Sequence, residues 1–84
     1  MSAGVYAEIK AERSRQDSKW GSQTHGSFVY ATVLAEECGE VARAIHDARF
    51  AGGSIADVRA ELIQVAAVAV QIVERIDGGR ITWE

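Results

Sequence analysis

The sequence predicts a small all-α protein with three helices in a single domain, and three observations lead to this prediction. The chain has 84 residues and no proline, and its apolar content favours helices over strands. Its apolar residues recur at intervals of three and four along two long segments, the period of a helix that is buried on one face. Glycine-containing turns separate the segments. At this length, residues 1–84 form at most one domain.

The first helix is predicted from about Ser2 to Lys19. One of its faces starts apolar and becomes polar toward the C-terminal end. Two polar residues, Arg13 and Gln16, occupy positions where a plain core helix would place Leu or Ala. The spacing of four, four, three and four residues defines this face as Val5, Ile9, Arg13, Gln16 and Trp20.

The second helix is predicted from about Phe28 to Phe50. A turn-rich loop over residues 21–26 precedes it, and Ser27 is a plausible N-cap. The pair Gly52-Gly53 ends this helix.

The third helix is predicted from about Ile55 to Asp77. Ser54, followed three residues later by Asp57, resembles a capping box in which the acid is Asp. Gly78-Gly79 stops the helix. Because the connection between the second and third helices is short, these two helices should be antiparallel neighbours.

Both long helices carry a heptad seam that must be covered by another surface. The seam of the second helix is Tyr30, Leu34, Glu37, Val41, Ala44 and Ala48. The seam of the third helix is Val58, Leu62, Val65, Ala69, Ile72 and Ile76. Two helices cannot enclose a core alone, so we expect a dimer, or a dimer of dimers, in which two hairpins form a four-helix bundle.

The size and charge of the chain limit its function classes. A chain this short is marginally stable alone, and the single Cys38 excludes a disulfide within it, which leaves oligomerisation or a metal. A net charge of −3 argues against a partner that is polymeric nucleic acid. The most apolar run, over 62–73, is too short for a membrane span, and the N-terminus lacks a signal-peptide core. We therefore expect a cytoplasmic protein that does not bind membranes.

Acidic residues form the main candidate site. Glu37 occupies a seam position, where an unpaired carboxylate is costly, and Glu36 and Glu40 lie on the same side of the helix. In an antiparallel hairpin, Glu61 of the third helix can face Glu37 and Glu40. A hard divalent cation such as Mg²⁺, with Mn²⁺ as a substitute, would supply the missing positive charge.

Other interpretations of these residues stay open at this stage. Glutamates on helices are usually solvated, and these could pair with Arg43 or Arg59. Asp57 could complete a metal site or simply cap its helix. A ferritin-like di-iron site is excluded because it requires Glu-x-x-His motifs, and the chain has none. His25 and His46 do not have the spacing of a zinc site.

Two segments together resemble a known family. Glu-Glu-Cys-Gly-Glu over 36–40, followed by Glu61-Leu-Ile-Gln64, is similar to the acidic motifs of MazG-like nucleotide pyrophosphohydrolases, which are all-α enzymes. The stretch Lys-Trp-Gly-Ser-Gln-Thr-His over 19–25 resembles the N-terminal segment of short, often phage-encoded, members. The resemblance covers roughly residues 9–74, and a phage-encoded protein would act in the host cytoplasm.

The resemblance implies Mg²⁺-dependent hydrolysis of a nucleoside or deoxynucleoside triphosphate to the monophosphate and pyrophosphate. It implies metal ligands at Glu37, Glu40 and Glu61, with Gln64 at the position where the family has Asp. This departure removes one negative charge. It therefore also supports an alternative, a non-catalytic helical module that binds a nucleotide or a protein partner.

The same resemblance suggests roles for neighbouring residues. Glu36, beside the ligand Glu37, could orient or deprotonate the attacking water. The predicted substrate-binding residues are Arg13, Gln16, Lys19, Trp20, Gln23 and His25. Among these, the two cations would pair phosphate oxygens and Trp20 would stack on the base. Trp20 could instead close the end of the bundle, and His25 could stabilise a turn.

Overall fold

A computed structural model describes residues 3–21 and 24–83 of the chain. It contains three helices, α1 (Ala3–Trp20), α2 (Ser27–Phe50) and α3 (Ile55–Asp77), and two strands of two residues each, β1 (His25–Gly26) and β2 (Ile81–Thr82). The prediction of an all-α fold with three helices is confirmed. The predicted start of the first helix at Ser2 lies outside the described residues.

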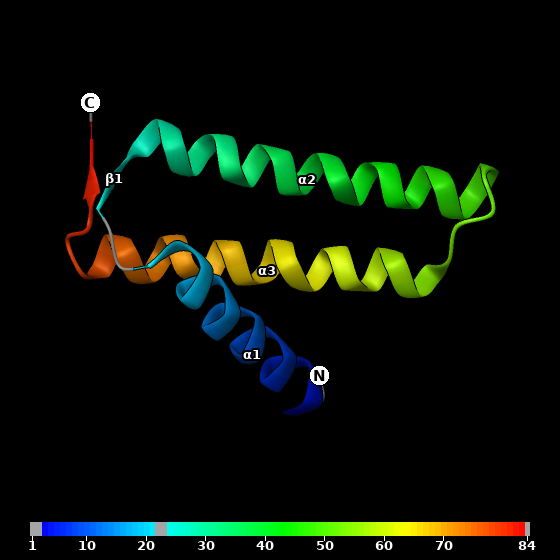
Figure 1. Cartoon of the computed structure of the whole chain (residues 1–84), viewed down its shortest axis with the longest axis horizontal. Coiled ribbons are helices and arrows are strands. Elements are labelled where there is room, and N and C mark those ends of the chain that lie inside the picture. The colour runs from blue at the N-terminus through cyan, green and yellow to red at the C-terminus, as the bar shows by residue number, and fades with distance from the viewer. Residues whose placement is uncertain (1–2, 22–23, 84) are drawn as a thin grey trace.

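The helices form a hairpin with an additional helix across it. In Figure 1, α2 and α3 run antiparallel beside each other, and α1 crosses α3 obliquely. At the end of the hairpin, β1 and β2 pair in parallel, with His25 opposite Ile81 and Gly26 opposite Thr82. The sequence showed no strand signal here. This pairing forms because the fold brings the segment before α2 next to the segment after α3.

The helix termini confirm one predicted cap and correct another. The Ser54 Oγ accepts a hydrogen bond from the Asp57 backbone N–H at 3.1 Å, as expected of an N-cap. The prediction that Ser27 caps α2 is wrong, because Ser27 is the first helical residue and Gly26 is the N-cap. Gly26 belongs to β1, and its strand pairing already provides the extended backbone that an N-cap needs.

The C-terminus of α2 requires a glycine. The backbone N–H groups of Ala51 and Gly53 both donate to the Asp47 carbonyl oxygen at 2.9 Å. Between them, Gly52 has φ = 75°, in the left-handed region that glycine adopts without strain. The chain can therefore reverse its direction within a few residues, and α3 then runs antiparallel to α2.

The predicted faces of the helices are confirmed for α1 and α2 but not for α3. All predicted seam residues of α2 are at least half-buried, and so is the predicted face of α1. On α3, however, Leu62, Ala69 and Ile76 are exposed, whereas Val68 and Gln71 are buried. The reason is that α3 packs against both α1 and α2, so its buried arc lies between the two contacts rather than on the heptad seam.

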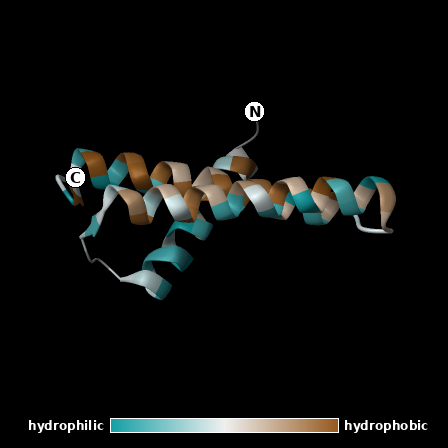
Figure 2. Cartoon of the chain, turned by 90° about the horizontal axis from the view of Figure 1, so that it is seen from above, coloured by the Kyte–Doolittle hydropathy of each residue, from teal (hydrophilic) through white to brown (hydrophobic). Residues whose placement is uncertain are grey.

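The enclosed core of the described chain is small. Its buried apolar residues are Tyr30, Ala67, Val68 and Ile81, and its buried polar residues are Gln16, Gln71 and Arg75. Figure 2 shows that hydrophobic residues remain on the surface of the hairpin, while the C-terminal part of α1 is hydrophilic. None of the described helices is long and apolar enough to cross a membrane.

Candidate functional site

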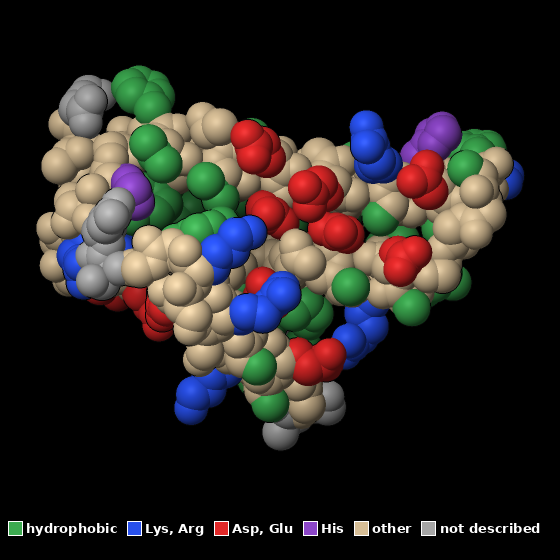
Figure 3. All heavy atoms as spheres, in the orientation of Figure 1, with side chains coloured by type: hydrophobic (Ala, Val, Ile, Leu, Met, Phe, Trp, Pro, Cys, Tyr) green, Lys and Arg blue, Asp and Glu red, His purple; other side chains and the backbone are tan. Residues whose placement is uncertain are grey.

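Three glutamates from two helices come together in the middle of the hairpin. Glu37 and Glu40 on α2 and Glu61 on α3 each place a carboxylate oxygen within 4.8 Å of the other two. We call these residues the acidic cluster. Figure 3 shows acidic side chains gathered along the line between α2 and α3, with basic side chains of α1 beside them. The structure thus brings together the three acids that the sequence predicted as ligands.

The electrostatics of the acidic cluster are unfavourable for three charged carboxylates. Burial raises the pKa of Glu37, and the charges of Glu40, Glu61, Glu12 and Glu36 raise it further. Burial also raises the pKa of Glu61, with further contributions from a hydrogen bond and charge repulsion with Glu40. Both shifts arise because the anionic form is surrounded by other anions and shielded from water.

The carboxylates of the acidic cluster form no ion pair among the described residues, although Arg43 lines the same hollow as Glu40 and Glu61. The Oε2 atoms of Glu37 and Glu61 are buried and have no hydrogen-bond partner. Arg59, one of the cations that could have neutralised the cluster, instead binds Glu8 with an Nη2–Oε2 distance of 2.6 Å. Carboxylates in such surroundings are usually paired with a cation or bound to a metal.

The donor set of the cluster fits a hard divalent cation. Mg²⁺ takes oxygen ligands and is commonly bound through one or two carboxylates, with water or phosphate oxygens completing the shell. The unpartnered oxygens of Glu37 and Glu61 are donors of this kind. Asp57 lines a hollow of about 440 Å³ together with Glu40 and Glu61. Its backbone N–H donates to Ser54 Oγ, and the charge of its carboxylate contributes to the raised pKa of Glu61.

A polar cavity of about 110 Å³ adjoins the acidic cluster. It is lined by Glu12, Arg15, Gln16, Lys19, Trp20, Glu37 and Gln64, which come from all three helices. Gln16 is 5% exposed, and its Oε1 atom has no hydrogen-bond partner within the described structure. Glu37 belongs both to this cavity and to the acidic cluster.

Two residues of the polar cavity were not predicted as site residues. Glu12 accepts hydrogen bonds from Arg15 Nε at 3.0 Å and Nη2 at 2.7 Å. The sequence carries a signal for them, because Glu12, Arg15 and Lys19 are spaced by three and four residues and so share one side of α1. This side lies next to the predicted apolar-to-polar face, which alone guided the sequence prediction.

A second, mainly apolar cavity of about 290 Å³ lies at the end of the hairpin near β1. It is lined by Trp20, Gly21, His25, Val29, Tyr30, Val33, Gln71 and Arg75. The rings of His25 and Tyr30 meet edge to face, with their centroids 5.7 Å apart. Trp20 lines both the apolar and the polar cavity, so the two hollows are neighbours.

The other predicted residues are found in different surroundings. Arg13 does not line the polar cavity; its Nη2 atom lies 2.6 Å from Glu74 Oε1, and its Nη1 atom lies 3.1 Å from Asp17 Oδ1. Glu36 is exposed on α2 and its charge acts on Glu37. The predicted base-reading residue Gln23 lies outside the described residues.

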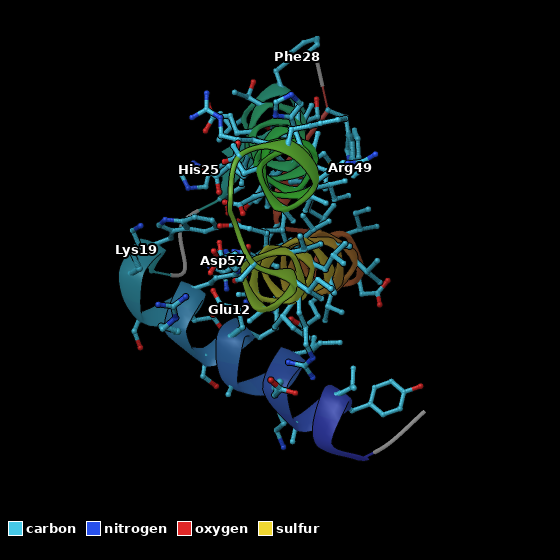
Figure 4. The ribbon with its side chains drawn as sticks, turned by 90° about the vertical axis from the view of Figure 1, so that its right-hand side faces the viewer. Glu12, Lys19, His25, Phe28, Arg49 and Asp57 are labelled. Atoms are coloured by element: carbon cyan, nitrogen blue, oxygen red, sulfur yellow. The ribbon has the colours of Figure 1, made fainter. Side chains whose placement is uncertain are left out.

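The view along the hairpin shows which elements face the site. In Figure 4, Glu12, Lys19, His25 and Asp57 lie on the side of the hairpin that α1 covers, whereas Phe28 lies at the outer edge of α2. The α1 helix therefore forms one wall of the site, opposite the acidic side chains of α2 and α3.

Comparisons of this chain with protein-family models, with curated proteins and with solved structures find no match.

Proposed function

We propose that this protein hydrolyses nucleoside or deoxynucleoside triphosphates to the monophosphate and pyrophosphate, with Mg²⁺ as cofactor. The observation that carries the proposal is the row of three adjoining features: the acidic cluster, the polar cavity and the apolar cavity. Glu37 is common to the first two and Trp20 to the last two. A metal, a phosphate chain and a base follow one another in the same order in a nucleotide bound to Mg²⁺.

In this proposal, Glu37, Glu40 and Glu61 hold the metal, with Mn²⁺ as a possible substitute. When bound, the metal neutralises phosphate charge and polarises the phosphorus that is attacked. Gln64 lines the polar cavity next to Glu37, and its amide can offer a neutral oxygen to the metal.

Cations of α1 support the phosphate chain in this proposal. Lys19 and Arg15 line the polar cavity and can pair with phosphate oxygens, Arg15 after exchanging its bond with Glu12. Arg13 has a structural role in this proposal rather than the predicted role in phosphate binding, because its guanidinium group donates to Glu74 and Asp17. Trp20, at the junction of the cavities, offers a flat surface on which a base can stack.

Hydrolysis also needs a positioned water molecule. Glu36, exposed beside Glu37, can accept a proton from a water whose oxygen attacks the α-phosphorus. The bond between the α-phosphorus and the bridging oxygen breaks, and pyrophosphate leaves with its electron pair. The chain supplies positioning and charge for this step rather than a covalent intermediate.

We also propose that two copies of the chain pair their hairpins into a four-helix bundle. Large apolar side chains are exposed along both helices, among them Ile45, Leu62, Val73 and Ile76, which are 47–56% exposed. Exposed apolar surface of this extent commonly marks an interface. Sedimentation velocity of the wild type and of Val73→Asp tests this: the wild type should sediment as a dimer or tetramer and the variant as a smaller species. A wild-type monomer at high concentration would contradict it.

A non-catalytic module that binds a nucleotide or a protein is the second candidate function. The observation that favours it is Gln64, a neutral side chain on the wall of the polar cavity beside Glu37. Such a module would bind Mg²⁺ weakly and would release no pyrophosphate.

Pyrophosphate release separates the two candidates. The wild type, Glu37→Gln and the control Glu8→Gln are each incubated with Mg²⁺ and a panel of NTPs and dNTPs. The control removes one negative charge at a position outside the acidic cluster. We expect turnover by the wild type and the control and at least a hundredfold loss in Glu37→Gln, since catalysis depends on the bound metal. Absence of turnover with every nucleotide would refute the enzyme and favour the module.

A further inference from the structure

We infer that Gln71 on α3 and Tyr30 on α2 read the hydrogen-bonding edge of a nucleobase inside the apolar cavity, and so determine base specificity. This inference deepens the proposed function and rests on it for the identity of the ligand. It concerns two residues that no sequence motif indicated as binding residues.

The burial of Gln71 needs a physical reason. It is 2% exposed, in the most enclosed part of the described structure, where α3 packs against its neighbours. Its Oε1 atom has no hydrogen-bond partner among the described residues. Leaving a buried acceptor unsatisfied costs about 1–3 kcal/mol, and an apolar residue of similar size would avoid this cost.

Tyr30 is in the same position on the other wall of the cavity. It is 6% exposed, and its hydroxyl also lacks a hydrogen-bond partner within the described structure. Both residues line the same cavity of about 290 Å³. Neither oxygen is open to solvent, and a rotation of each side chain toward the cavity would let a ligand, rather than the protein, complete its hydrogen bonds.

The chemistry of the cavity wall defines the class of ligand. The Gln71 carbonyl oxygen accepts a hydrogen bond, and the Tyr30 hydroxyl can donate or accept one. The ligand therefore presents an N–H or O–H next to a second polar atom. The rings of Trp20, His25 and Tyr30 offer surfaces to a flat ligand. Among the described residues that line the cavity, the charged one is Arg75, whose guanidinium donates to the Gly21 carbonyl oxygen, and none is a carboxylate that would attract a cation. A nucleobase has these properties.

The size and position of the cavity agree with this assignment. Its volume of about 290 Å³ lies just below the roughly 300–1,000 Å³ that small-molecule sites span, which is enough room for a single base. Because Trp20 also lines the polar cavity, a base in this position would direct its sugar and phosphates toward Lys19 and the acidic cluster.

The alternative explanation is that ordered water satisfies both groups and the cavity has only a structural role. The two explanations differ in what a substitution at Gln71 changes. A structural role predicts that Gln71→Met, which keeps the volume and removes the acceptor, alters stability and leaves ligand binding unchanged. A reading role predicts that it weakens binding selectively.

The experiment measures binding of free nucleosides to the whole chain in EDTA. Without phosphates or metal, only the base and sugar contribute, so the result does not depend on catalysis. Adenosine, guanosine, cytidine and uridine are titrated into ¹⁵N-labelled wild-type protein, and chemical shifts of the Trp20 indole and the Gln71 amide are followed. The best ligand is then compared with an analogue that is N-methylated at its hydrogen-bonding edge and so lacks the N–H donor.

We expect at least one nucleoside to bind and both residues to shift. Gln71→Met should weaken the binding of this nucleoside about tenfold, and methylation of the base should have the same effect on the wild type. Because both changes remove the same hydrogen bond, the methylated base should bind Gln71→Met no more weakly than either change alone predicts. Tyr30→Phe should reduce the discrimination between bases. The exposed Tyr6→Phe serves as its matched control and should bind like the wild type. If Gln71→Met does not fold, the wild type with the methylated analogue provides the test.

Three results would overturn the inference: no nucleoside binds, methylation has no effect on binding to the wild type, or methylation weakens binding to Gln71→Met as much as to the wild type. Its failure is distinguishable from failure of the proposed function. Pyrophosphate release without nucleoside binding would refute only the reading role, and nucleoside binding without hydrolysis would refute only the enzyme.

Discussion

Glu37→Gln is expected to change stability in opposite directions with and without Mg²⁺. In the metal-free protein, Glu37 is half-buried, its Oε2 has no partner, and carboxylates surround it. The amide removes the repulsion, a few tenths of a kcal/mol for each neighbour. It also removes part of the burial cost, which is about 1–3 kcal/mol for an unsatisfied polar group. Part of this gain is lost because the amide still needs a partner, so the metal-free variant should be more stable by about 1 kcal/mol.

Mg²⁺ should reverse this order. A ligand present at about 100 times its dissociation constant stabilises the folded state by about 2.7 kcal/mol. The wild type should gain this stabilisation, whereas Glu37→Gln loses a charged ligand and should gain much less. For a domain of 84 residues, a change of about 1 kcal/mol corresponds to roughly 4–8 °C in Tm. The two effects are therefore large enough to separate by calorimetry.

The assay is differential scanning calorimetry in EDTA and in Mg²⁺, at one protein concentration. The control is Glu8→Gln, which removes the same charge from an exposed residue bound to Arg59. It should be no more stable than the wild type and should keep the full response to Mg²⁺. The reasoning is refuted if Glu37→Gln melts below the wild type in EDTA, or if Mg²⁺ raises the Tm of both equally.

Three further predictions concern pH, the cations of α1 and the cap of α3. Because the pKa of Glu61 is raised by folding, the metal-free folded state binds this proton more tightly than the unfolded state. The free energy of unfolding should then fall as pH increases from the ordinary carboxyl pKa through the raised value. Urea titrations across this pH range should show a smaller fall in the free energy of unfolding for Glu61→Gln than for the wild type. Arg13→Gln should lower the free energy of unfolding by about 1 kcal/mol and leave KM unchanged. Lys19→Gln should raise KM about tenfold with little change in Tm. A change of KM in Arg13→Gln would contradict the structural role of Arg13. Ser54→Ala should cost about 1 kcal/mol in urea unfolding, and a neutral result would show that the cap is dispensable.

The sequence was sufficient to predict the three helices because their signals are local. Hydrophobic period, glycine stops and the Ser54 cap act within a few residues, and the structure agrees with them. The pairing of β1 with β2 had no such signal, since it joins residues that are more than fifty positions apart. The same reason explains the wrong N-cap at Ser27, which depends on that pairing.

The acidic cluster could be predicted because it needs only one long-range fact, that two helices connected by a short loop run antiparallel. Once this is assumed, Glu37 and Glu40 must face α3, and Glu61 lies at the matching height. The cations of α1 could not be assigned in the same way. Arg13 and Arg15 are two positions apart, roughly 200° around a helix, so they point in nearly opposite directions. Which of them faces the site depends on how α1 crosses α3, and the sequence pattern does not encode this crossing.

The buried glutamine illustrates a different limit. In the sequence, Gln71 interrupts the apolar run over 62–73, and no motif marks it as a core or a binding residue. The structure makes it one of the most buried side chains of the described chain, because α3 is covered on two sides and its buried arc includes positions outside the heptad seam. Among the described residues, the core contains three buried polar side chains, Gln16, Gln71 and Arg75, beside four buried apolar ones. A core of this composition is less stable than an apolar core of the same size. Departures of this kind are expected at functional sites, and these polar residues line the two cavities in which we propose that the ligand binds.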